Sequence, residues 1–170
     1  MYQVRKLELH EHPFLLEMLY ESIHIPENKP EINELLNSNG LKKYSENWGR
    51  PGDNALAAVD EEGHMLGAVW YRLFSQDEPG YGFVDQHTPE LGMAIRESER
   101  GKGVGSLLMS EIIRLAKEQQ YDALSLSVDP ENTYAVRLYK KFGFVKTGVS
   151  GTSDTMVCNV HEVYELVKKN

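Results

Sequence analysis

Three glycines at alternate positions, accompanied by two cations, form the feature of this sequence with the clearest chemical meaning. They lie in the segment 95–106, which reads IRESERGKGVGS and joins a predicted strand to a predicted helix. Because glycine has no Cβ, the backbone N–H groups of such a loop can converge on an anion at the positive end of the helix. A tight turn would account for a glycine pair, but three glycines together with Arg100 and Lys102 favour a diphosphate site.

Two common phosphate-binding loops do not fit this spelling. A P-loop needs Ser or Thr after its Gly-Lys pair, whereas Gly101-Lys102 is followed by Gly103. A dinucleotide-binding fingerprint needs a third glycine where Ser106 stands. A nucleotide-binding phosphotransferase is therefore the weaker hypothesis.

The spelling does match R-x-x-G-x-G, and here the sequence resembles the GCN5-related N-acetyltransferase (GNAT) superfamily. The match runs from Arg100 to Gly105. A second stretch, from Asn132 to Phe144, is similar to the family's second signature: an Asn, then an Ala, then Leu-Tyr and a closing Gly-Phe. With the preceding strand these signatures cover residues 88–149, while residues 10–50 and 150–170 match only in outline.

The resemblance implies acetyl-CoA as cosubstrate and a place for it. In this family the strand corresponding to residues 91–95 splays from the strand at 123–128, and the pantetheine arm enters the gap. The arm would contact Met93, Ala94 and Ile95, and Asn132 would reach it from the start of a helix that Asn132 also caps. The pyrophosphate would rest on the loop formed by Arg100, Gly101, Lys102, Gly103, Val104, Gly105 and Ser106.

Direct attack of an amine on a thioester leaves the protein few chemical tasks besides holding both reactants close. The resemblance implies that a backbone N–H near Ile95 stabilises the oxyanion. It places Tyr139 as the general acid for the departing thiolate, although helical spacing alone would make this residue a core aromatic. Glu90, at the start of the splayed strand, is the candidate general base, with His87 and Asp85 in reserve. A non-catalytic acyl-CoA-sensing module of the same fold is the alternative function.

Composition limits the remaining function classes. The chain has 170 residues, a single cysteine and a formal net charge of -8, with pI about 5.3. These values predict one globular domain over residues 1–170 without disulfides, in a reducing cytoplasm, and disfavour nucleic acid as a partner. The sequence has no signal-peptide pattern and no membrane span. Six scattered histidines form no H-E-x-x-H spacing, so we predict no catalytic metal, and Cys158 in an apolar run is expected to be buried and inert.

The elements that must position these residues follow from hydrophobic spacing and turn signals. Together they predict an α/β (α+β) sandwich: a central mixed, mostly antiparallel sheet of about seven strands, flanked by about four helices, with splayed strands in the middle. Pro89 predicts an edge or an opening in the sheet, and Gly143 a left-handed helix cap. Strands are predicted at 2–9, 55–60, 65–74, 88–95, 122–128, 144–149 and 155–167, and helices at 12–20, 30–44, 104–120 and 132–142.

The acceptor is the least determined partner. The loop 75–87 carries three acids, Asp77, Glu78 and Asp85, and two aromatic residues towards the expected substrate strand, which raises the hypothesis of a cationic amine. Trp48, Trp70 and Tyr71 either pack the core or line the acceptor pocket. A small molecule and a peptide both remain open as acceptors, and homodimerisation is common in such folds without being specified by this sequence.

Overall fold

The computed structural model describes residues 1–169 as one open, mixed sheet of seven strands in the order β1-β2-β3-β4-β5-β7-β6. All neighbouring pairs are antiparallel except β4 with β5. No helix of these residues is long and apolar enough to span a bilayer. The strands are β1 (Gln3–Lys6), β2 (Asn54–Val59), β3 (Met65–Arg72), β4 (Glu90–Ile95), β5 (Ala123–Val128), β6 (Val145–Ser150) and β7 (Ser153–Asn159). The α-helices are α1 (His12–Ser22), α2 (Ile32–Leu36), α3 (Val104–Glu118), α4 (Thr133–Lys141) and α5 (Val160–Val167), with 3-10 turns η1 (Leu9–Glu11), η2 (Lys42–Tyr44) and η3 (Glu97–Glu99).

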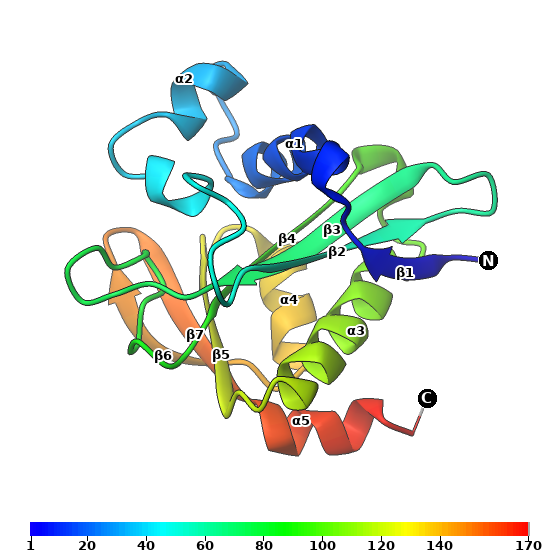
Figure 1. Ribbon diagram of the computed structural model, residues 1–170. Helices are drawn as coiled ribbons and strands as arrows, with labels where there is room; N and C mark the ends of the chain where they lie inside the picture. The colour runs from blue at the N-terminus through cyan, green and yellow to red at the C-terminus, as the bar shows by residue number, and fades with distance from the viewer. Residues whose placement is uncertain (170) are drawn as a thin grey trace.

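Helices cover both faces of the sheet (Figure 1). On one face, Trp70 and Ala94 pack against Phe14 and Met18 of α1. On the other face lies the larger core, in which α3, α4 and α5 bury their apolar sides against the strands. Because side chains alternate along a strand, Glu90 shares the α1 face with Ala94, whereas Leu91 and Ile95 face α3.

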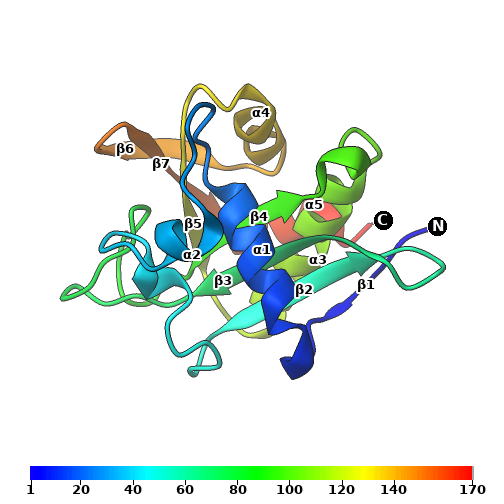
Figure 2. The same ribbon diagram turned by 90° about the horizontal axis from the view of Figure 1, so that it is seen from above.

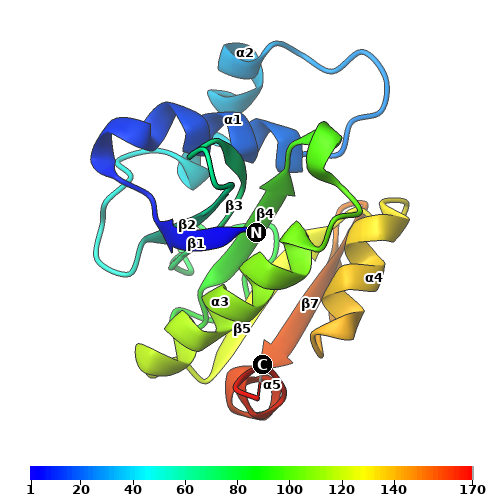
Figure 3. The same cartoon turned by 90° about the vertical axis from the view of Figure 1, so that its right-hand side faces the viewer.

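The sheet opens between its two parallel strands. β4 and β5 share a single residue pair, Glu90 with Ser125, next to a 3.0 Å hydrogen bond from the Ser125 N–H to the Pro89 carbonyl. Beyond that pair the strands have no further registered partners in residues 1–169, and Figure 3 shows α3 and α4 on the side of the sheet where they separate. The splayed strands that the family resemblance implies are thus present in the interior of the sheet, whereas Pro89 itself lies at the end where β4 and β5 still pair.

Local sequence sets the two helix starts that border this opening. Gly103 caps α3 with a φ of 87°, and Gly101 has a φ of 78°, a region that residues with a Cβ rarely adopt. Asn132 caps α4 by accepting a hydrogen bond from the Ala135 N–H at 3.3 Å. Gly143, with a φ of 81°, follows α4 as the predicted left-handed cap.

Three predicted elements differ from the structure. The helix expected over 30–44 is reduced to α2 and the short turn η2, because the polar stretch 37–40 interrupts its apolar pattern. The first strand ends at Lys6 and not at residue 9. The strand expected over 155–167 is wrong in its second half: Asn159 accepts a hydrogen bond from the Glu162 N–H, which starts α5 as a fifth helix.

Candidate active site

One cavity of about 1030 Å³ passes through the opening between β4 and β5. Trp70 and Glu90 line it from the α1 face, and Leu138 and Tyr139 line it from the face covered by α3 and α4. A volume of this size suits an extended small ligand. The cavity therefore connects the two faces of the sheet at the point where the strands separate.

Glu90 is a buried carboxylate within this cavity. Its Oε2 accepts a 2.6 Å hydrogen bond from the Tyr44 hydroxyl, and its Oε1 accepts a 3.0 Å bond from the Gly82 N–H. Its side chain is only 6% exposed, and burial raises its pKa from 4.5 to about 7 despite both bonds. A carboxylate with such a pKa can exchange a proton near neutral pH.

Tyr139 lies on the other face, in the last turn of α4. Its ring packs against Phe144 with the centroids 5.8 Å apart, and burial raises its pKa to about 12. The side chain lines the cavity, and no hydrogen bond to its hydroxyl is formed within residues 1–169. The phenol therefore stays protonated at neutral pH with its proton available to a ligand.

The glycine loop presents unpaired backbone donors. Within residues 1–169, none of the N–H groups from Gly101 to Ser106 has a hydrogen-bond acceptor, and these groups form the positive end of α3. A Cβ at Gly101 or Gly103 would meet nothing within 4 Å, so the loop is open on that side. Arg100 lines the cavity directly. The chemistry of this loop fits a phosphate group.

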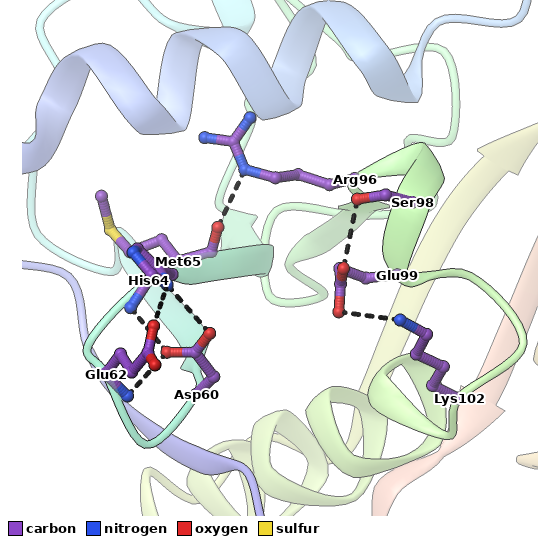
Figure 4. Close-up of polar contacts among 8 residues, drawn as sticks. All are labelled: Asp60, Glu62, His64, Met65, Arg96, Ser98, Glu99 and Lys102. Carbon is purple, nitrogen blue, oxygen red and sulfur yellow. Dashed lines mark hydrogen bonds and ion pairs between the residues drawn. The ribbon is translucent and has the colours of Figure 1, made fainter.

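The lysines near the loop are placed differently from each other. Lys102 reaches back to Glu99 at 3.5 Å, as Figure 4 shows, and it does not line the cavity. Lys141, at the end of α4, donates to the Ser106 hydroxyl at 3.2 Å and so brings a cation to the start of α3. Lys141 is not among the site residues predicted from the sequence, although it lies within the second signature, nine residues after Asn132.

A smaller hollow of about 390 Å³ lies beside the β2–β3 hairpin (Figure 4). Its charged groups are engaged with one another or with backbone: His64 pairs with Asp60 at 3.1 Å, and Arg96 donates to the Met65 carbonyl at 2.8 Å. Nothing in this hollow points to a ligand.

The free edge of β4 supplies further backbone donors. The Arg96 N–H bonds to the Leu66 carbonyl of β3 at 2.8 Å. Since successive N–H groups of a strand alternate in direction, those of Met93 and Ile95 point towards the gap before β5. Met93, Ala94 and Ile95 all line the cavity.

At the far wall, Asn132 also lines the cavity. The His24 Nδ1 lies 2.9 Å from the Asp129 carboxylate, which links the loop after α1 to the loop after β5. Figure 2 shows these two loops side by side. The sequence gives no signal for this contact, which joins residues 105 positions apart.

The loop 75–87 contributes an aromatic ring to the cavity wall and none of its carboxylates. Asp77, Glu78 and Asp85 do not line it, and neither does the reserve base His87. Tyr81 does, stacked on Tyr44 with the centroids 6.3 Å apart. The loop turns its acids outwards because its buried positions are taken by Gly80 and Gly82, which pack against Glu90 and β5.

The structure distinguishes the roles of the three aromatic residues that the sequence assigned either to the core or to the acceptor pocket. Trp70 lines the cavity and packs against α1, while Tyr71 is fully buried in the core. Trp48 stacks over the Arg72 guanidinium, 5.0 Å from its ring centroid. Tyr44, which the sequence analysis did not single out, contacts Glu90 directly.

A ligand-sized opening through a mixed sheet lies next to a helix start with unpaired N–H groups, an arrangement that suits a long anionic ligand across the middle of the sheet. A family model described as Acetyltransferase (GNAT) family matches residues 14–144. The chain belongs to this family, and both the predicted family and the predicted fold are confirmed.

Named relatives agree with this assignment. The chain is 31% identical over 121 residues to a mycothiol acetyltransferase from Paenarthrobacter aurescens, covering 69% of this chain and 35% of that protein. It is 36% identical over 89 residues to a peptidyl-lysine N-acetyltransferase from Salmonella typhimurium, covering 51% and 56%. The chain thus spans about a third to a half of these relatives' length. The spermidine N-acetyltransferase from Vibrio cholerae, solved with CoA and spermine, shares the fold with a TM-score of 0.66 at 19% identity, covering 95% of this chain and 97% of that one.

Proposed function

We propose that this protein is an N-acetyltransferase that moves the acetyl group of acetyl-CoA to a primary amine of a small molecule or peptide within one ternary complex. The observation that carries the proposal is the placement of Glu90 and Tyr139 on opposite faces of the sheet, lining one cavity. A base on one side of a reacting carbonyl and an acid on the other are what direct amine attack requires.

The residues present fit acetyl-CoA. The pyrophosphate would lie on the unpaired N–H groups from Gly101 to Ser106, with Arg100 and Lys141 as nearby cations. Lys102 is held by Glu99 in this structure and would join only by releasing it. The pantetheine arm would pair with the free edge of β4 at Met93, Ala94 and Ile95, opposite Asn132. When bound, acetyl-CoA supplies the acetyl thioester that the amine attacks.

The chain's own groups then have three tasks. The Glu90 carboxylate accepts the proton that the attacking ammonium loses. The N–H of Ile95, pointing into the gap, donates to the carbonyl oxygen as negative charge develops there. The Tyr139 hydroxyl gives its proton to the departing sulfur as the C–S bond breaks.

The residues that line the cavity limit the kind of amine that it can accept. Its α1 side combines the rings of Tyr44, Trp70 and Tyr81 with the carboxylates of Glu21 and Glu90. This lining suits an amine carried on an apolar or weakly polar body. The relatives' names supply two probes, a lysine-containing peptide and spermine.

Thermal unfolding tests the cofactor part of the proposal. A ligand at about 100 times its Kd adds about 2.7 kcal/mol, which should raise Tm by several degrees at this size. We expect acetyl-CoA to raise Tm and ATP at the same concentration to leave it unchanged. A rise with ATP alone, or with neither, would remove the assignment of the glycine loop. Amine-dependent thiol release then separates the enzyme from an acyl-CoA sensor that binds without turnover.

A further inference from the structure

We propose that Tyr44 is the positioning residue of the acceptor site: its hydroxyl holds the Glu90 carboxylate in the orientation in which it takes a proton from the attacking amine. This inference rests on the proposed role of Glu90 as base. It assigns a function to η2, an element outside both signature motifs of the sequence.

When Glu90 is ionised, the hydrogen bonds around Tyr44 have a single direction, because a carboxylate can only accept. The Tyr81 N–H donates to the Tyr44 oxygen at 2.7 Å. The single hydroxyl proton of Tyr44 is therefore free to point at the Glu90 Oε2, 2.6 Å away. With the Gly82 N–H on Oε1, each carboxylate oxygen has one donor and keeps one lone pair for an incoming proton.

The tyrosine itself is fixed from several sides. Its ring contacts Phe74 edge to face, with centroids 5.1 Å apart, and stacks on Tyr81. The backbone on either side of it is held by Arg72, whose Nη1 donates to the Lys43 carbonyl at 2.9 Å and to the Glu46 carbonyl at 2.7 Å. The hydroxyl therefore has little freedom to leave Glu90.

Arg72 is also the residue directly opposite Glu90 on the neighbouring strand. It does not pair with Glu90, because its Nε and Nη2 donate to the two Asp53 carboxylate oxygens, at 2.9 and 2.8 Å, in a fully buried ion pair. A guanidinium on Glu90 would strongly favour the ionised carboxylate and so weaken it as a base. The Asp53–Arg72 pair thus anchors η2 and leaves Glu90 to a neutral donor, Tyr44.

The other charged and titratable groups near Glu90 come from η2, α1, α4 and the loops between elements. Lys43 of η2 stands over the Tyr81 ring at 4.9 Å and donates to the Pro79 carbonyl, and its charge acts on Glu90 only as a minor influence. The cavity that Glu90 shares is also lined by Glu21, His24, Lys29, Arg100, Asp129 and Tyr139. None of these side chains bonds to the Glu90 carboxylate, whereas the Tyr44 hydroxyl does.

The loop 75–87 packs closely against Glu90. A Cβ at Gly80 would lie 2.2 Å from the Glu90 Oε1 and 2.9 Å from the Tyr44 oxygen. A Cβ at Gly82 would lie 2.6 Å from the Leu126 backbone of β5. The glycine-bearing loop therefore closes tightly over the pair formed by Tyr44 and Glu90.

The test is Tyr44→Phe, which keeps the ring and removes the hydroxyl. Because the lost bond stabilises the ionised carboxylate, the midpoint of the pH profile of kcat/KM should move to higher pH, and kcat/KM at neutral pH should fall by about tenfold. Thiol release from acetyl-CoA with spermine or a lysine peptide provides the rates. Tyr71→Phe is the matched control, because Tyr71 loses a bond to Gln119 on the opposite face of the sheet. The control should keep the wild-type midpoint.

A double-variant comparison separates positioning from general damage. If Tyr44 acts through Glu90, Tyr44→Phe should have little further effect in a Glu90→Gln background. A full additional loss in that background, or an unchanged pH midpoint in the single variant, would overturn the inference.

A direct titration makes the result independent of the acceptor. In protein labelled with ¹³C at the glutamate carboxyls, the Glu90 resonance is assigned by its loss in Glu90→Gln, and its midpoint should rise in Tyr44→Phe. An unmoved midpoint would refute the role of Tyr44 even when the wild type is active. Conversely, a raised midpoint in a protein that releases no thiol would contradict the proposed function while leaving the contact between Tyr44 and Glu90 intact.

Discussion

Glu90 and Tyr139 line one cavity from opposite faces of the sheet. Glu90 reaches it from the α1 side at the single registered pair between β4 and β5, and Tyr139 reaches it from α4. Burial raises both pKa values, to about 7 for the carboxyl and about 12 for the phenol. The two groups are thus prepared for opposite proton transfers at neutral pH.

Replacing Glu90 by Gln should remove the proton acceptor. In the wild type, the base works only when ionised, so kcat/KM should rise with pH and level off above about pH 7. Glu90→Gln should lower kcat/KM by about 100-fold and abolish that midpoint. Glu11→Gln is the control, because Glu11 is a buried glutamate paired with Arg5, and it should retain the profile. A wild-type midpoint surviving in Glu90→Gln would place the base elsewhere.

The same substitution should change how stability depends on pH. The pKa of Glu90 is raised from 4.5 to about 7 in the fold, so the folded chain binds this proton more tightly than the unfolded chain does. Its contribution to the free energy of unfolding is complete below the lower value and is lost as the pH rises to about 7. The difference in Tm between Glu90→Gln and the wild type should therefore shift in favour of the variant as the pH rises from about 4 to about 8. Tm curves that run parallel with pH would show that the pKa of Glu90 is not raised in the fold.

Removing the Tyr139 hydroxyl should slow turnover without weakening cofactor binding. Its proton is needed only when the C–S bond breaks, so Tyr139→Phe should reduce kcat by about 100-fold while the acetyl-CoA-induced rise in Tm persists. Tyr164→Phe in α5 is the control, since that ring packs against the core away from the cavity. An unchanged kcat in Tyr139→Phe would remove this residue from the acid role.

A methyl group at Gly103 should damage acetyl-CoA binding through the backbone. Gly103 has a φ of 87°, and alanine there costs about 1 kcal/mol and reorients the loop N–H groups. Gly103→Ala should raise the Kd of acetyl-CoA by about tenfold or more in calorimetry. Gly63→Ala is closely matched, with a φ of 86° and open space around it, but it lies in the β2–β3 turn. Equal losses in both variants would mean that strain, and not the loop, affects binding.

Much of the fold and part of the site could be predicted from the sequence because the signals are local. The positive φ angles at Gly101 and Gly103 and the cap at Asn132 each depend on a few neighbouring residues. Tyr44 and Lys141 escaped prediction because their contacts, with Glu90 and Ser106, join residues 46 and 35 positions apart. The fifth helix was missed for a different reason: β-branched and other apolar residues occur on both sides of Asn159, and the cap at Asn159 decides where the strand ends and α5 begins.

Amine-dependent release of CoA thiol from acetyl-CoA, measured in a single turnover with spermine and with a lysine peptide, tests the central claim most directly. We predict that thiol appears together with an equal amount of acetylated amine, with a rate that rises through about pH 7. Acetyl-CoA binding without thiol release, across primary amines of varied size and charge, would contradict acetyl transfer and leave a binding module of the same fold.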